Sequence, residues 1–185
     1  MSYISEDGLK YRKTLDLDAD AFQLTLYALA LGLNVQLVYE WGVGQSTLAF
    51  LRAVQRTGGH VVSCDINAGM ADFVRNIAPD AMARWTLHNL SSEKMWEIVH
   101  DQADLIFIDG CHSYSCVVEE VPMYWSLLKA DGLMVLHDTR SWETGPGEVL
   151  RLCAVRGLEV AELPMCLGLG IIHKRMGDPE VLVLE

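Results

Sequence analysis

Short apolar runs alternate with longer amphipathic stretches along most of this chain, and the alternation restricts the fold more than any other feature. The clearest runs are "ADLIFIDG" (103–110) and "GLMVLHDT" (132–139). Each is apolar almost throughout and ends in polar residues, as in strands buried on both faces of a parallel sheet. Because helical spacing separates such runs from about residue 35 to residue 139, the sequence predicts a doubly wound α/β sheet.

Two further β-rich runs close the chain, "LEVAELPM" (158–165) and "GLGIIHKRM" (168–176). A glycine-containing connection between them predicts an antiparallel hairpin. The chain has 185 residues, near the size of one domain, and it contains no internal repeat or low-complexity linker. We therefore expect a single domain over 1–185, in which 1–34 form an N-terminal extension and helix.

Charge and composition exclude several classes of protein. The net charge of -11 argues against a nucleic-acid surface and against binding to an anionic membrane. No apolar run reaches the ~20 residues of a membrane span, and the first residues lack the apolar core of a signal peptide. The five cysteines form no C-x-x-C pair, which favours reduced thiols in a cytoplasmic protein. The sequence is compatible with a homodimer.

The stretch "VYEWGVGQST" (38–47) predicts a strand that leads into a glycine-rich turn. Gly42 and Gly44 fit a dinucleotide fingerprint, but its third glycine is replaced by Thr47. Glu40 is also unfavourable beside a pyrophosphate, whereas it suits a cationic group such as the sulfonium or ammonium of S-adenosylmethionine. Both features argue against a nicotinamide-dependent oxidoreductase.

The residues after this turn predict further contacts with such a cofactor. Gln45 and Ser46 begin the next helix, whose N-terminus favours the carboxylate of a ligand. Asp65 ends the second predicted strand, about 20 residues later, where a carboxylate can accept hydrogen bonds from both ribose hydroxyls.

Together, "YEWGVGQSTLAFL", "VVSCDIN", "LIFIDGCHSY" and "SLLKADGLMVLHDT" resemble the class I S-adenosylmethionine-dependent methyltransferases. The likeness covers roughly residues 35–174, the expected cofactor-binding core. The motifs "IDGxHSY" and "LHDT" resemble the branch of small-molecule and sugar O-methyltransferases. This resemblance implies a Rossmann-like sheet of seven strands, mostly parallel with an antiparallel last strand. The implied cofactor contacts are Glu40, Gly42, Gly44 and Ser46 at the methionine end, Asp65 at the ribose, and Ile66 and Ser91 near the adenine. "HNL" before Ser91 departs from the usual Gly-Asp.

The far strand ends carry candidate catalytic and metal-binding residues. His112, three residues after Asp109, can act as a general base because an imidazole titrates near pH ~6.5; a loop histidine bonded to backbone is the alternative. Asp109, His137 and Asp138 could hold a divalent cation such as Mg2+, as in some relatives, although relatives that require a metal tend to have an acidic residue in place of His137. Alternatively, Asp109 contacts the cofactor's ammonium and Asp138 bonds the following loop.

We expect methyl transfer to a hydroxyl of a small-molecule acceptor; a non-catalytic cofactor-binding or regulatory protein on the same fold is the alternative. Aromatic side chains near the strand ends could wall the acceptor pocket, or belong to the core or rim. They are Trp41, Tyr114, Trp125 and Trp142. The glycine-rich segment 140–148 could act as a lid or be a solvated loop. Glu119 and Glu120 are expected on a solvated helix face.

Overall fold

The computed structural model describes residues 2–4, 10–12, 17–141 and 145–184. Seven strands form one sheet in the order β5-β4-β3-β6-β7-β9-β8. The strands are β3 (Leu37–Trp41), β4 (His60–Cys64), β5 (Trp85–His88), β6 (Ala103–Ile108), β7 (Leu128–His137), β8 (Glu159–Leu163) and β9 (Leu169–His173). The first five pair in parallel, and β9 runs antiparallel to both β7 and β8. The predicted fold class, including the terminal hairpin, is confirmed.

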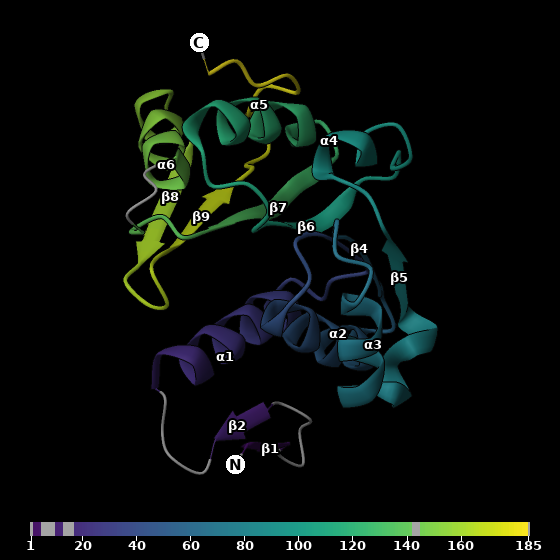
Figure 1. Ribbon diagram of the computed structural model, residues 1–185. Coiled ribbons are helices and arrows are strands. Elements are labelled where there is room, and N and C mark those ends of the chain that lie inside the picture. The colour runs from purple at the N-terminus through teal and green to yellow at the C-terminus, as the bar shows by residue number, and fades with distance from the viewer. Residues whose placement is uncertain (1, 5–9, 13–16, 142–144, 185) are drawn as a thin grey trace.

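Helices cover both faces of the sheet (Figure 1). They are α1 (Leu17–Gly32), α2 (Gln45–Thr57), α3 (Met70–Ile77), the 3-10 helix η1 (Pro79–Arg84), α4 (Ser92–Met95), α5 (Tyr114–Trp125) and α6 (Gly145–Val155). Helices α1, α2 and α3 lie on one face, and α4, α5 and α6 on the other. A short antiparallel pair, β1 (Ser2–Ile4) and β2 (Lys10–Arg12), precedes α1. No described helix is long and apolar enough to cross a membrane.

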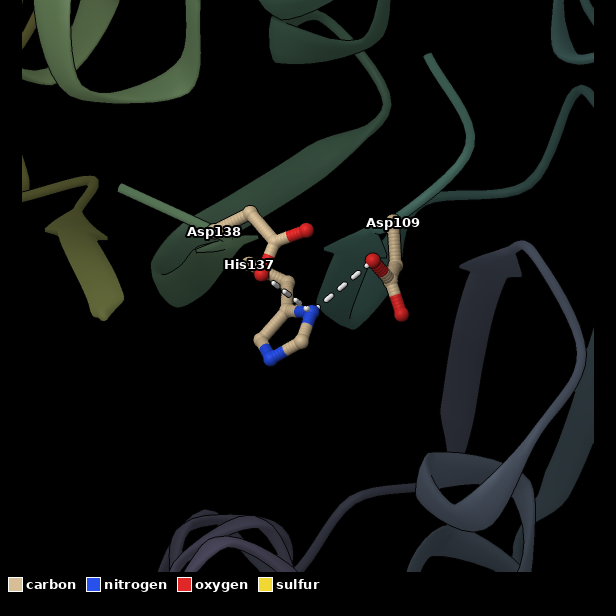
Figure 2. A group of neighbouring side chains, drawn as sticks. All are labelled: Asp109, His137 and Asp138. Carbon is tan, nitrogen blue, oxygen red and sulfur yellow. Dashed lines mark hydrogen bonds and ion pairs between the residues drawn. The ribbon is translucent and has the colours of Figure 1, made fainter. Parts of the chain in front are cut away.

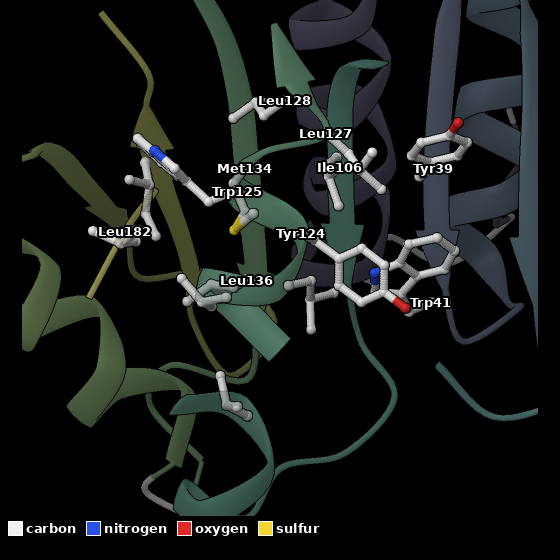
Figure 3. Packing of buried hydrophobic residues seen from close by; sticks show 14 of the residues in the cluster. Tyr39, Trp41, Ile106, Tyr124, Trp125, Leu127, Leu128, Met134, Leu136 and Leu182 are labelled. Atoms are coloured by element: carbon white, nitrogen blue, oxygen red, sulfur yellow. The ribbon is translucent and has the colours of Figure 1, made fainter. Parts of the chain in front are cut away.

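The two faces of the sheet bury different hydrophobic clusters because successive strand residues point to opposite sides. In β3, Tyr39 and Trp41 pack toward α5 with Ile106, Tyr124 and other residues drawn in Figure 3. Val38, the residue before Tyr39, points to the opposite face and packs toward α1 and α2. The central strands are thus packed on both faces, so the loops at their carboxyl ends are attached to rigid elements.

Candidate active site

A cavity of about 320 Å³ opens at the carboxyl ends of β3, β4, β5 and β6. It is lined by five of the predicted cofactor contacts, namely Gly42, Asp65, Ile66, Ser91 and Asp109. Four other predicted contacts, Glu40, Gly44, Gln45 and Ser46, are not among its lining residues. Central strand ends of an open α/β sheet are where such folds bind ligands.

The turn after β3 requires glycine at its first position. Gly42 has φ +93°, and a Cβ there would lie 2.3 Å from the carbonyl oxygen of Asp109. The two loops that carry Gly42 and Asp109 therefore approach each other more closely than any side chain would permit. The turn is completed by side chains, because Asp65 Oδ2 accepts a hydrogen bond from the Val43 amide at 2.9 Å.

Glu40 lies beneath this turn, not in the cavity. Its side chain is fully buried and accepts hydrogen bonds from three hydroxyls, those of Ser46 at 2.7 Å, Thr47 at 2.8 Å and Ser63 at 2.6 Å. Burial raises the pKa of Glu40 to about 7, because three neutral donors compensate only in part for lost hydration. The carboxyl expected to face a cation instead joins β3, β4 and the first turn of α2.

The opposite side of the cavity combines a carboxylate with an apolar surface. Asp65 follows β4, and its Oδ1 accepts a hydrogen bond from the Asn67 amide at 2.7 Å. The neighbouring Ile66 is 79% exposed, so its side chain is accessible to a ligand in the cavity. Leu90 and Ser91 line the cavity from the loop after β5. This wall therefore places a hydrogen-bonding carboxylate next to apolar side chains.

Beyond Asp109, four ionisable side chains meet at the ends of β6 and β7. His137 Nδ1 lies 2.9 Å from Asp109 Oδ1 and 3.4 Å from Asp138 Oδ1. His112 Nε2 lies 3.3 Å from Asp109 Oδ1 and 3.4 Å from Asp138 Oδ2. Figure 2 shows Asp109, His137 and Asp138 converging from the two strands. The predicted catalytic and metal-binding residues therefore form one cluster, which we call the His-Asp cluster.

Opposite charges control the ionisation of this cluster. Burial acts to raise the pKa of Asp109, but hydrogen bonds and charges from His112 and His137 outweigh it and hold that pKa below its usual value. Burial acts to lower the pKa of His137, yet the hydrogen bond that His137 donates to Asp109, with the charges of Asp109 and Asp138, prevails and raises it. The cluster can therefore accept and hold a proton near neutral pH.

Two segments that are distant in the sequence shape the cluster, and no motif pointed to either. The ring of Phe22, in α1, lies 4.7 Å from the His137 ring between centroids. Gly145 begins α6, and a Cβ there would lie 2.3 Å from the His112 carbonyl oxygen. Phe22 closes the cluster on the α1 side, and Gly145 allows α6 to pack directly on the backbone that carries His112.

The structure corrects the expectation for Glu120 and separates the candidate aromatic residues into cavity, surface and core positions. Glu119 is exposed, but Glu120 is only 1% exposed, so the prediction of a solvated face was wrong for Glu120. Helical spacing could have shown this, because residues 117, 120, 121 and 124 lie on one face of α5. Among the candidate aromatics, Trp41 lines the cavity and Tyr114 is 44% exposed.

Trp125 is a core residue, whose indole donates a hydrogen bond to the Pro179 carbonyl. Trp142 lies outside the described residues, as does the middle of the candidate lid, 142–144.

Solved structures with this fold include several methyltransferases. An S-adenosylhomocysteine-bound methyltransferase from Podospora anserina is 18% identical, with a TM-score of 0.66, and the match covers 88% of this chain and 80% of that one. An O-methyltransferase from Bacillus cereus in complex with S-adenosylhomocysteine is 16% identical, with a TM-score of 0.68 and coverage of 84% and 81%. A putative caffeoyl-CoA O-methyltransferase from Staphylococcus aureus is 20% identical, with a TM-score of 0.65 and coverage of 88% and 85%.

At these identities the similarity to solved structures shows the fold alone. No curated protein matches the sequence. The profile of the methyltransferase domain family matches residues 39–139, more than half of the chain, from β3 to the end of the His-Asp cluster. The chain belongs to the methyltransferase domain family.

Proposed function

We propose that this protein transfers the methyl group of S-adenosylmethionine to a hydroxyl of a small molecule. One observation carries the proposal: the cavity that follows β3 and β4 ends at Asp109, and Asp109 is also a member of the His-Asp cluster. Methyl transfer needs a bound donor and an acceptor hydroxyl aligned beside it, with a group that takes the hydroxyl's proton. Asp109 joins the two halves of such a site.

The lining of the cavity fits the cofactor. Asp65 would accept hydrogen bonds from the ribose hydroxyls, and Ile66 and Ser91 would border the adenine. The methionine end would lie beside Gly42 and Asp109, which both line the cavity. Glu40 and Ser46 would act indirectly, by holding the turn in place from below.

His112 is the proposed general base. Its side chain is 26% exposed, against 16% for His137, so it is the more accessible of the two imidazoles. After His112 takes the hydroxyl proton, the carboxylates of Asp109 and Asp138 would stabilise the imidazolium. His137, buried against Phe22, would hold Asp109 in place.

The same cluster also fits a divalent cation. One ligand atom from each of Asp109, His137 and Asp138 lies within 4.8 Å of the others. His137 Nδ1 lies 2.9 Å from Asp109 Oδ1 and 3.4 Å from Asp138 Oδ1. Adjacent ligands of an octahedral ion with bonds of about 2.1 Å are roughly 3 Å apart, which is close to these separations. A bound cation would lower the pKa of the acceptor hydroxyl and orient it.

Replacing the base tests the proposal. In His112→Gln we expect kcat for methyl transfer, over a panel of hydroxylated small molecules, to fall about 100-fold with an unchanged dissociation constant for S-adenosylhomocysteine. His173→Gln is the matched control, because His173 lies at the opposite end of β7, beside Leu133. Assays with and without a chelator separate a metal-dependent reaction from one that uses His112 alone.

Unchanged turnover in His112→Gln would remove the residue as base. An active wild type would exclude the non-catalytic alternative. Calorimetry that detects no binding of S-adenosylhomocysteine at millimolar concentration would overturn the whole proposal.

A further inference from the structure

Two cysteines, Cys111 and Cys116, lie next to each other on the wall of the cavity. Both line it, and both are half-buried free thiols. Cys111 lies in the loop between Asp109 and α5, and Cys116 lies in the first turn of α5. Their thiols are within hydrogen-bonding reach of each other. The cavity therefore contains a pair of adjacent thiols that the proposed function does not use.

The start of α5 determines the position of the Cys111 sulfur. Ser113 is the N-cap of this helix, and its hydroxyl lies 3.4 Å from Cys111 Sγ. The backbone amide of Ser113 also donates a hydrogen bond to Cys111. These contacts hold the sulfur against α5 and therefore beside Cys116. Redox-sensing cysteines are typically accessible thiols with a second cysteine close enough to form a disulfide with them.

A buried carboxyl group lies beside the pair. Glu120, one turn after Cys116 in α5, is only 1% exposed. Its Oε1 accepts a hydrogen bond from Ser92, and its Oε2 is buried without a hydrogen-bond partner among the described residues. Burial raises the pKa of Cys116, and its contact with Cys111 and the charge of Glu120 raise it further. Because burial also raises the pKa of Glu120, its carboxylate is a stronger base than usual and can take the proton of Cys116.

We propose that Cys111 and Cys116 form a reversible disulfide that lowers methyl-transfer activity under oxidising conditions. The oxidant is a disulfide of low molecular mass, such as oxidised glutathione. The inference goes beyond the proposed function. Formation of the bond does not depend on methyl transfer, whereas its effect on turnover does.

The bond forms by thiol–disulfide exchange in two steps. The Cys111 thiolate attacks one sulfur of oxidised glutathione, forms a mixed disulfide and releases one glutathione thiolate, which takes up the proton lost by Cys111. The Cys116 sulfur, after giving its proton to Glu120, attacks the Cys111 sulfur and releases the second glutathione thiolate, which takes up this second proton. Two electrons and two protons thus pass from the cysteines to glutathione, and a reducing thiol reverses both steps.

Closure of the bond must move the loop that carries His112. The S–S distance of a disulfide is about 2.05 Å, shorter than any contact between two thiols, so Cys111 must move toward α5. His112 follows Cys111 directly, and its Nε2 lies 3.3 Å from Asp109 Oδ1 and 3.4 Å from Asp138 Oδ2. Because displacing a catalytic group reduces the rate, we expect kcat to fall about tenfold in the oxidised protein.

The bond can be detected directly in the wild-type protein. The protein is incubated with excess oxidised glutathione, alkylated, denatured and cleaved after Tyr114, which lies between the two cysteines. We expect two fragments that stay linked through Cys111 and Cys116 until a reductant is added. Cys64 and Cys153 are 2% and 0% exposed and should remain reduced, which shows that the bond formed in the folded protein.

The ratio of kcat before and after oxidation connects the bond with turnover. The wild type should lose about tenfold and recover with a reductant. A double variant with Cys111→Ser and Cys116→Ser should give a ratio near one, whatever its own activity. Cys166→Ser is the matched control and should respond as the wild type does, because Cys166 is also half-buried but does not line the cavity. Glu120→Gln should close the disulfide at least about tenfold more slowly.

Four outcomes are decisive. Wild-type protein without a fragment linked through Cys111 and Cys116 in excess oxidised glutathione overturns the inference, and this result needs no variant to fold. A disulfide that forms while kcat keeps its value removes the effect on activity. Closure at the wild-type rate in Glu120→Gln removes Glu120 as the proton acceptor. A linked fragment in a protein without methyl-transfer activity would overturn the proposed function and leave the disulfide itself established.

Discussion

Two carboxyl groups at the ends of neighbouring strands, Glu40 and Asp109, have pKa values shifted in opposite directions. Glu40 belongs to β3 and Asp109 follows β6, the strand that pairs with β3. The partners of Glu40 are three neutral hydroxyls, and its pKa is raised to about 7. The partners of Asp109 are two imidazoles, and its pKa is lowered although burial acts to raise it.

The difference separates a structural carboxyl from a reactive one. Neutral donors satisfy the oxygens of Glu40 without stabilising its charge enough to offset burial, so it serves to hold the turn after β3. The imidazoles near Asp109 can become positively charged, so each group stabilises the ionised form of the other. The same substitution, carboxylate to amide, should therefore have contrasting effects at the two positions.

The largest effect is expected for Asp109→Asn. The amide cannot balance a positive charge on His112 or His137, so we expect kcat for methyl transfer to fall by about 1000-fold. The pKa of His137, followed by NMR, should drop because its main stabilising partner is neutral. Weaker binding of S-adenosylhomocysteine with nearly normal kcat would contradict this result, and would support the alternative in which Asp109 contacts the cofactor's ammonium.

Glu40→Gln should affect stability and its pH dependence, with turnover largely retained. From the unfolded value of 4.5 to the folded value of about 7, the folded protein binds more protons at Glu40 than the unfolded chain does, so the free energy of unfolding falls as pH rises through this window. The loss attributable to Glu40 is on the order of 3 kcal/mol.

Urea denaturation at pH 5, 6, 7 and 8 measures this effect. Because the glutamine variant lacks the titrating group, its stability relative to wild type should increase with pH. Parallel pH curves for the two proteins would show that Glu40 does not titrate in this range, and the contrast with Asp109 would then lose its basis.

The sheet and the residues at its carboxyl edge could be predicted from the sequence. The strands and their order of succession were predictable because runs such as 103–110 have no other stable location than a buried sheet. Residues Asp109, His112, His137 and Asp138 were predictable as a group, since parallel strands end at the same edge of the sheet.

The environments of individual carboxyls were not predictable in the same way. Sequence placed Glu40 in the turn, but its burial depends on the hydroxyls of Ser46, Thr47 and Ser63 meeting it from two other elements. The same holds for Phe22, which reaches His137 only through the packing of α1 on the sheet. Motifs locate residues along the chain, whereas tertiary packing decides which side chains meet and whether water reaches them.

The smallest effect is expected for Gly145→Ala. This variant tests whether the packing of α6 positions His112 in the His-Asp cluster. The new Cβ would lie 2.3 Å from the His112 carbonyl oxygen, so the backbone carrying His112 or the start of α6 must shift. Because misplacing a catalytic group reduces the rate without removing its chemistry, we expect kcat to fall about tenfold. The change in the free energy of unfolding caused by Glu40→Gln should be the same in the Gly145→Ala background as in the wild type. Gly32→Ala is the control, since a Cβ there meets no atom within 4 Å. If Gly145→Ala kept full activity, the position of His112 would tolerate displacement, and the His-Asp cluster would depend on its charges more than on its exact geometry.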